Sequence, residues 1–385
     1  MMKHPLWLVP FRPFFILTCL AGLGLPLVWV LLYTGAVPPA PTFPVAPLQW
    51  HVHEMFYGFG WAGLGGFLLT ASKNWVGVRG WHGKALVFLV LAWLLDRLAM
   101  SLGAAWPPAV FWTAISVFQV AVTVMLLQIF LQQRHQMDGS DNYLFWMLLP
   151  LFPVAKLLIV QGDYFQLGWG MSLALFRVII LIMLERTQQQ YMRFAFKLEI
   201  RRDPDLDMPI KWLGLLLVFA GWLPVPVAVA GEIALAILLL ERFFGWHPRR
   251  ALSRLDIGIM YLAYLMIVLQ LVLSAFGRLT EMPWVGTVSV HVFTIGAMSL
   301  VLPAMIIRIS QGMTGREIVF GAADRFALWL LIGGLFARVV LPQIYPAGYA
   351  FSLHLSATAW LLGFGTLLWR FAPMLLAPRI DGREH

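Results

Sequence analysis

Charged residues are scarce in this chain, and cysteine is almost absent. Asp, Glu, Lys and Arg make up 12% of the 385 residues, whereas about a quarter is usual in soluble domains. The single cysteine, Cys19, excludes an intrachain disulfide and a zinc site built from cysteine pairs. Any metal must therefore be bound by His, Met, Tyr, carboxylate or backbone atoms.

The chain instead contains long hydrophobic runs. The chain is 61% hydrophobic, and runs close to the roughly 20 residues that cross a bilayer as a helix recur along it. These runs predict an all-α fold, a polytopic bundle of about 12 transmembrane helices in a single domain over 1–385. Pro224 and Pro226 separate the seventh and eighth spans, and the alternative is one long kinked span. The predicted spans are 14–34, 50–72, 84–103, 108–132, 142–160, 164–184, 209–224, 226–244, 255–277, 284–307, 323–341 and 347–370.

Basic residues are divided unevenly between the two sides of this predicted bundle. If the N-terminus is cytoplasmic, the outer loops contain only Arg278 and Arg338 of the 27 Lys and Arg residues, and Arg97, Lys156 and Arg177 lie within spans. The positive-inside rule then predicts that both termini are cytoplasmic. Contact with anionic lipids on that side explains the net charge of +9, so we expect no nucleic-acid partner.

Residues 185–211 form the longest predicted cytoplasmic loop. Its stretch 188–202 mixes aromatic and aliphatic residues with basic ones, which is typical of an amphipathic helix on the membrane surface. A plain continuation of the sixth helix is the alternative.

Most ionisable residues within the predicted spans fall in the outer half of the membrane, although Arg177 and Tyr261 lie nearer its middle or inner half. Buried charges without partners are costly in hydrocarbon, so we expect the outer groups to form a cluster. These outer residues are His51, His53, Glu54, Asp96, Arg97, Lys156, Glu232, His291 and His354.

Two of these histidines begin the same pattern, His-x4-Gly-x18-Gly, which starts at His53 and at His291. Both helices enter from the same predicted side. Two imidazoles at similar depth, each above a glycine that permits close approach, suit a flat cofactor held between helices. Chance is the alternative in a glycine-rich membrane protein. The glycines are Gly58, Gly77, Gly296 and Gly315.

Each candidate residue also has a structural interpretation. His51 and His53 are two residues apart, on different sides of a helix, so we do not expect them to share one metal. His354 is equally well explained as a hydrogen-bond donor to a neighbouring helix. Basic residues within or beside the spans can neutralise acidic cofactor groups such as propionates, or only extend towards the interface. These are Arg97, Arg177 and Arg338.

Short motifs along nearly the whole chain resemble those of a known protein family. The stretches are Phe11-Arg12-Pro13-Phe14-Phe15, Trp50-His51-Val52-His53-Glu54-Met55, Gly66-Phe67-Leu68-Leu69-Thr70-Ala71, Asn74-Trp75, His291-Val292-Phe293-Thr294-Ile295-Gly296-Ala297, Arg308-Ile309-Ser310, Thr314-Gly315-Arg316, Ala372-Pro373-Met374, Pro378-Arg379 and Asp381-Gly382. In this order they resemble the NnrS family of membrane proteins. The resemblance implies a bacterial inner-membrane protein that contains haem b and copper and is linked to nitric oxide, denitrification and resistance to nitrosative stress.

Two positions depart from the family pattern. The family has Arg-Ile-Ile-Pro where this chain has Arg177-Val178-Ile179-Ile180, and a histidine where this chain has Tyr261. If that histidine is a ligand in the family, this protein uses Tyr261 or has lost the site.

The leading hypothesis is a haem protein, with copper, that binds nitric oxide or a related small redox ligand. We expect His53 or His291 as the axial haem ligand and His51 and His354 as copper ligands, with Glu54, Tyr261 and Glu232 beside them. Arg97, Arg177 and Arg308 are the expected cofactor-binding arginines. One alternative is a secondary transporter whose polar path contains Glu232, Lys156 and Arg97. Another is a membrane sensor that signals through the 185–211 loop.

Overall fold

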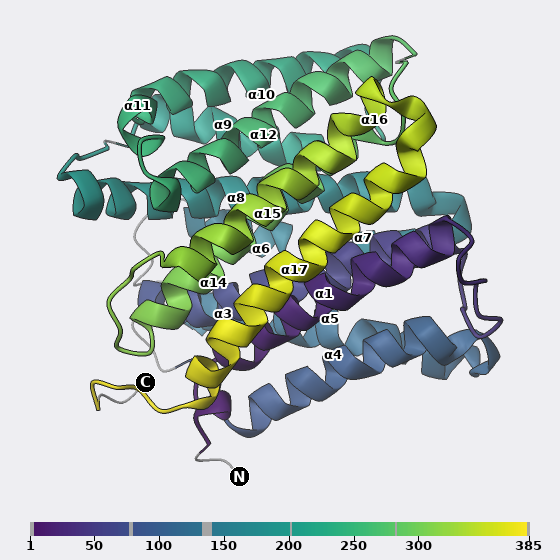
Figure 1. Cartoon of the computed structure of the whole chain (residues 1–385), viewed down its shortest axis with the longest axis horizontal. Coiled ribbons are helices and arrows are strands. Elements are labelled where there is room, and N and C mark those ends of the chain that lie inside the picture. The colour runs from purple at the N-terminus through teal and green to yellow at the C-terminus, as the bar shows by residue number, and fades with distance from the viewer. Residues whose placement is uncertain (1–3, 77–79, 133–140, 201, 282, 383–385) are drawn as a thin grey trace. The chain divides into compact units, whose positions relative to one another are not determined.

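The computed structural model describes residues 4–76, 80–132, 141–200, 202–281 and 283–382. All regular elements in these ranges are helical, which confirms the predicted all-α class (Figure 1). Nine of the described helical segments are long and apolar enough to cross a membrane. They are Phe11–Tyr33, Lys84–Ala105, Pro108–Leu131, Tyr143–Val160, Gly162–Phe196, Leu255–Leu279, Val288–Gly312, Ala322–Ile344 and Pro346–Leu376.

Three predicted spans are not among these nine. Helix α9 (Pro204–Leu216) has 13 residues and rises only about 20 Å, against a hydrocarbon thickness of about 30 Å. Helix α10 (Val225–Gly245) is longer, but it includes Glu232, Glu241 and Arg242. The segment 50–72 is rich in glycine and is divided among several helical pieces. The span number of twelve and the cytoplasmic termini therefore stay predictions.

The chain divides into two compact units, and unit 1 consists of Met1–Trp169, Met305–Ala327 and Trp360–His385. Its helices pack closely at glycines: a Cβ atom on Gly66 would lie 2.5 Å from the Cβ of Phe14, and one on Gly22 would overlap the ring of Phe364. The main helices of unit 1 are α1 (Phe11–Tyr33), α2 (Pro47–His53), η2 (Glu54–Gly60), α3 (Trp61–Val76), α4 (Lys84–Leu102), α5 (Pro108–Gln132), α6 (Asp141–Leu148) and α7 (Leu151–Val160).

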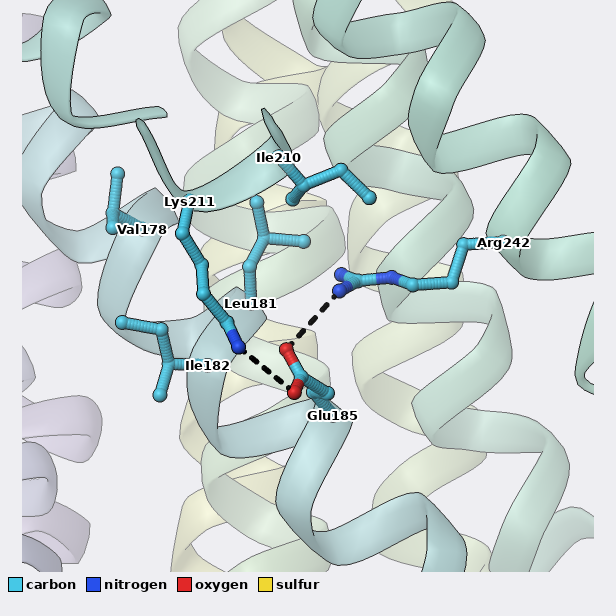
Figure 2. A pocket seen from close by; sticks show the side chains of 7 residues that line it. All are labelled: Val178, Leu181, Ile182, Glu185, Ile210, Lys211 and Arg242. Atoms are coloured by element: carbon cyan, nitrogen blue, oxygen red, sulfur yellow. Dashed lines mark hydrogen bonds and ion pairs between the residues drawn. The ribbon is translucent and has the colours of Figure 1, made fainter. Parts of the chain in front are cut away.

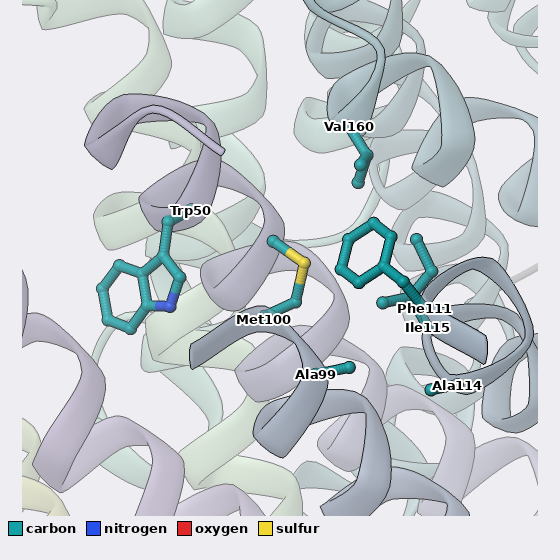
Figure 3. Packing of buried hydrophobic residues seen from close by; sticks show 7 residues of the cluster. All are labelled: Trp50, Ala99, Met100, Phe111, Ala114, Ile115 and Val160. Carbon is teal, nitrogen blue, oxygen red and sulfur yellow. The ribbon is translucent and has the colours of Figure 1, made fainter. Parts of the chain in front are cut away.

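An apolar cluster in unit 1 fixes the start of α2 against its neighbours. Trp50 lies in this cluster with Met100 of α4, Phe111 of α5 and Val160 of α7, and all four side chains are buried (Figure 3). Since Trp50 directly precedes His51, this packing sets the direction in which the histidine pair of α2 points.

The two ends of the described chain are joined to each other within unit 1. The Arg12 guanidinium donates hydrogen bonds to the carbonyls of Leu375 (2.6 Å) and Ala377 (2.7 Å), which lie at the end of α17 (Tyr349–Leu376). Further along, Arg379 donates to the carbonyl of Met313 at 3.1 Å. The resemblance motifs that contain Arg12 and Arg379 therefore have a structural role: they join the C-terminal segment to the rest of unit 1.

Unit 2 consists of Gly170–Ala304 and Leu328–Ala359. Helix α8 (Phe165–Phe196) is unbroken, so residues 188–196 continue the sixth predicted helix. It ends at Lys197, whose φ of 56° leaves the helical region. The other helices that contribute to this unit are α9, α10, α11 (Pro248–Ala251), α12 (Leu255–Leu279), α13 (Val288–His291), η6 (Val292–Met298), α14 (Ser299–Gly312), α15 (Ala322–Val339), α16 (Leu341–Ile344) and α17.

Candidate functional site

His53 and His291 each stand directly before a π-helical segment of seven residues, η2 in unit 1 and η6 in unit 2. Each π segment has a glycine as its fifth residue, Gly58 or Gly296, and each is followed by an α-helix. Short π segments within α-helices are uncommon and are frequent at functional sites. The repeat seen in the sequence therefore has a matching backbone as far as its first glycine. Gly77 lies outside the described residues.

Protein side chains fill the space at both glycines. A Cβ atom on Gly58 would overlap the guanidinium of Arg97 and lie 3.1 Å from Glu54 Oε2. A Cβ atom on Gly296 would lie 2.7 Å from Cγ of Met266. The close approach expected for a cofactor is thus made by a charged side chain in unit 1 and by an apolar one in unit 2.

Five of the predicted polar residues meet in unit 1, and we call them the His53 network. Glu54 is 3.1 Å from His53 Nδ1 through Oε1 and 3.0 Å from Arg97 Nε through Oε2. Asp96 Oδ2 is 2.8 Å from Arg97 Nη2 and 2.5 Å from Lys156 Nζ. Four of the five side chains are at most 2% exposed, and that of Arg97 is 12% exposed. With a neutral imidazole, two carboxylates balance two cations.

Aromatic residues surround the His53 network. The Tyr57 ring lies 5.7 Å from that of His53 and 5.5 Å from Lys156 Nζ, and its hydroxyl donates to the carbonyl of Phe152 at 3.0 Å. The Trp93 ring lies 5.4 Å from the Arg97 guanidinium, and its Nε1 donates to the carbonyl of Gly58 at 3.1 Å. The ionic groups are therefore enclosed by rings, where Coulomb interactions are weakly screened.

His51 lies outside this network. Its ring stacks on Trp29 of α1, with 4.2 Å between centroids and 10° between planes, and it is partly exposed. The side chain of His53 is fully buried. The two histidines therefore face different surroundings, as their spacing predicts.

In unit 2, His291 is held by the turn before it. Its Nδ1 lies 2.8 Å from the carbonyl oxygen of Thr287 and 2.9 Å from the Thr287 hydroxyl. A carbonyl only accepts, so this contact assigns the proton to Nδ1 and leaves the lone pair on Nε2. Metal-ligating histidines are usually oriented in this way.

The segment before Thr287 is shaped by an arginine and a tyrosine of the same unit. Gly286 has a φ of 77°, and a Cβ atom there would lie 2.7 Å from the Tyr349 hydroxyl and 3.1 Å from Arg338 Nη1. Arg338 also lies over the Tyr349 ring at 5.6 Å. A cation is thus positioned next to the segment that carries His291.

Arg177 and Glu232 belong to another polar group in unit 2. Arg177 donates to Gln270 Oε1 at 2.9 Å. Glu232 accepts from Ser274 Oγ at 2.9 Å and from Arg278 Nε at 3.2 Å. The three partners are spaced four residues apart on α12 and share one face. The predicted outer-half residues thus form more than one group.

Three other predicted residues have clear surroundings. The Tyr261 hydroxyl donates to the carbonyl of Trp246 at 2.6 Å, so it is used in packing α12 against the end of α10. Arg308 of unit 1 lies over the ring of Phe320 at 5.1 Å. His354 is exposed on α17.

A buried ionic cluster at Glu185 was not predicted from the sequence. Its carboxylate lies between Lys211 Nζ (3.0 Å) and Arg242 Nη1 (3.3 Å), beside an aliphatic wall (Figure 2). Asp207 is also 3.2 Å from Arg242 Nη1, and Tyr264 accepts from Arg242 Nε at 3.0 Å. These charges lie at predicted span ends or in loops, where exposure is the usual expectation. The aliphatic wall is formed by Val178, Leu181, Ile182 and Ile210.

The described residues do not include a preformed metal site with several side-chain ligands. Within the ranges given above, no group of three or more His, Cys, Asp or Glu side chains is placed to hold a metal ion. A haem iron needs only one or two axial ligands from the protein, so the His291 geometry suits it better than a copper ion that requires several protein ligands.

Comparison with known proteins points to a family. A family model described as NnrS protein matches residues 5–379, which is nearly the whole chain. No curated protein sequence matches the chain.

Proposed function

Because the chain belongs to the NnrS family, we propose that this multi-pass membrane protein binds haem b and, through it, nitric oxide or a related small redox ligand. The observation that carries the proposal is the His291 imidazole, with Nδ1 held by the Thr287 carbonyl at 2.8 Å. An Nδ1 donor of this kind makes Nε2 the nitrogen through which His291 would ligate the iron.

The surroundings of His291 support the same proposal. Val292 and Phe293, which follow it in η6, are buried and apolar. Arg338 lies beside Gly286 and can neutralise a propionate group. A haem iron bound by one neutral imidazole supplies a coordination position for a diatomic ligand. His291 would bind the haem iron, and Arg338 would pair with a propionate group of the haem.

His53 fits an axial role less well. Its ring is enclosed by the His53 network, and Nε2 lies 3.7 Å from Asp96 Oδ1. A ligand at Nε2 would have to displace that carboxylate from Arg97 and Lys156. We therefore assign the axial role to His291 alone.

The remaining parts of the proposal rest on family membership. They are copper as a second metal, a place in a bacterial inner membrane and a contribution to nitrosative-stress resistance. Metal analysis of the purified protein tests the copper proposal, and less than about 0.1 copper per chain after growth with copper would refute it.

An absorption spectrum tests haem binding. Protein produced with haem available should show a Soret band that shifts on reduction and on addition of nitric oxide. His291→Ala should remove or strongly alter this band, whereas His354→Ala, an exposed histidine of the same unit, should leave it unchanged. A colourless wild-type protein would refute the proposal, and an unchanged His291→Ala spectrum would refute the ligand.

Transport is a second candidate function, favoured by the matching His, π segment and glycine in the two units. Helices interrupted at corresponding positions of repeated halves are typical of secondary transporters. A solute flux in proteoliposomes that depends on Lys156 or Glu232 would support this candidate. Flux that is equal in wild type and in empty liposomes, over a panel of small anions and cations, would reject it.

A further inference from the structure

Three arginines of unit 1 lie where helices long enough to cross a membrane begin or end. Arg12 is at the start of α1, Arg316 follows the end of α14, and Arg379 follows the end of α17. Arg316 and Arg379 both repel Arg12 electrostatically. A bound anion relieves the repulsion between cations that are held together. All three arginines belong to motifs of the resemblance, and the haem proposal uses none of them.

Backbone contacts hold two of the guanidinium groups in place. Arg12 is buried and donates to the carbonyls of Leu375 at 2.6 Å and Ala377 at 2.7 Å. Arg379 donates to the carbonyl of Met313 at 3.1 Å. A carbonyl is a neutral acceptor, so these bonds fix a guanidinium without neutralising its charge. The repulsion is therefore built into the packing of the loop after α14 against the segment after α17.

Asp381 pairs with Arg379 through both carboxylate oxygens. Its Oδ1 accepts from Nε at 2.9 Å, and its Oδ2 accepts from Nη2 at 2.5 Å. Gly315 has a φ of 81°, and a Cβ atom there would lie 2.7 Å from Cγ of Asp381, so the turn before Arg316 packs directly on this pair. Arg316 is partly buried, donates to the Thr314 hydroxyl at 2.9 Å and forms no ion pair with a described residue. Within the described part of the chain, its guanidinium is therefore a cation bound to a neutral group.

Exposed aliphatic side chains lie in the same two segments. Ile380 directly follows Arg379, and Leu376 ends α17. Ile318 folds back on the end of α14, where a Cβ atom on Gly312 would lie 3.4 Å from its Cδ1. A soluble phosphate compound gains nothing from such side chains, whereas a phospholipid has acyl chains beside its phosphate group. Cations and aliphatic groups together at helix ends thus match a lipid.

We propose that the loop after α14 and the segment after α17 bind the phosphate group of an anionic phospholipid, at what we call the arginine site. Arg316 and Arg379 are partly exposed and would contact the phosphate, because a guanidinium forms paired hydrogen bonds with its oxygens. Arg12 is buried and would add positive charge without touching the lipid. The headgroup would reduce the repulsion and join the two ends of unit 1. This site is independent of the haem proposal, which rests on His291 in the other unit.

Lipid retention tests the arginine site. The full chain is placed in nanodiscs of equal parts dioleoylphosphatidylcholine and dioleoylphosphatidylglycerol, released into detergent and weighed by native mass spectrometry. We expect wild type to retain phosphatidylglycerol in preference to phosphatidylcholine, and Arg316→Gln to reduce this retention about fivefold. Arg249→Gln is the matched control, because it removes the same charge from an exposed residue of unit 2. Equal retention of the two lipids by wild type, or of phosphatidylglycerol by the two variants, would overturn the proposal.

Thermal unfolding in detergent separates the lipid from free phosphate. Phosphatidylglycerol should raise the unfolding midpoint of wild type but not of Arg316→Gln, and inorganic phosphate should raise neither. A midpoint raised by inorganic phosphate as much as by the lipid, and only with Arg316 present, would assign the site to a soluble phosphate compound and overturn the lipid proposal.

A charge-preserving variant keeps the test decisive if Arg316→Gln does not fold. Arg316→Lys retains the positive charge but loses the paired hydrogen bonds, so it should retain less phosphatidylglycerol than wild type. Retention by Arg316→Lys equal to that of wild type would overturn the proposed contact between Arg316 and the phosphate.

Discussion

Replacement of Gly58 by alanine tests whether this glycine serves the ionic network. An added Cβ would overlap Arg97 Nη1, so the guanidinium must move away from Glu54 and Asp96, which it contacts at 3.0 and 2.8 Å. Breaking a buried ion pair costs about 3–5 kcal/mol, and alanine recovers about 0.5–1 kcal/mol in a helical segment. Because the guanidinium is the mobile end of a long side chain, we expect a net loss of about 2–3 kcal/mol.

The measurement is reversible unfolding in mixed detergent, or the temperature midpoint where unfolding is irreversible. Gly24→Ala in α1 is the matched control, because a Cβ atom there meets nothing within 4 Å. In an Arg97→Ala background, the destabilisation by Gly58→Ala should fall below about 1 kcal/mol. If Gly58→Ala behaves like Gly24→Ala, or is equally destabilising with and without Arg97, the proposed role of Gly58 is wrong.

Three further changes test other contacts. Tyr261→Phe should destabilise the protein by about 1–2 kcal/mol, because the Trp246 carbonyl loses its 2.6 Å hydrogen bond. The variant should leave any Soret band unchanged, and loss of the band would indicate that Tyr261 is a ligand. Arg12→Ala should speed proteolysis of the segment after Ala377, which equal cleavage rates would contradict. Glu185→Gln should lower the unfolding midpoint, because Lys211 and Arg242 lose a shared anion; an unchanged midpoint would show that Asp207 suffices.

Part of the site was predictable from the sequence because helical depth and helical periodicity are local properties. Counting residues placed His53, Glu54, Asp96, Arg97 and Lys156 at similar depths, and they meet in unit 1. The i, i+2 spacing separated His51 from His53. In the same way, the prolines at 224 and 226 correctly marked the start of α10.

Other features depend on contacts that no local pattern records. The π segments have the same residue types as the α-helices around them, so periodicity did not reveal them. Gly58 was expected to leave room for a cofactor, but only the packing of α4 brings Arg97 into that space. The Glu185 cluster was missed because Lys211 and Arg242 are ordinary basic residues near predicted span ends, where exposure is the usual expectation.

The two π segments explain why two histidines with the same sequence pattern receive different chemical assignments. In unit 1 the space beside the glycine holds a guanidinium, so the histidine before it is drawn into an ionic network and both of its nitrogens face carboxylates. In unit 2 the same space holds the apolar side chain of Met266, and the nearest anchor of His291 is a neutral carbonyl. A metal at the first imidazole would have to displace a carboxylate of the network, whereas an imidazole that donates to a carbonyl through Nδ1 has Nε2 as its other ring nitrogen. The residue opposite the glycine therefore distinguishes the histidine of the ionic network from the histidine to which we assign the proposed haem ligation.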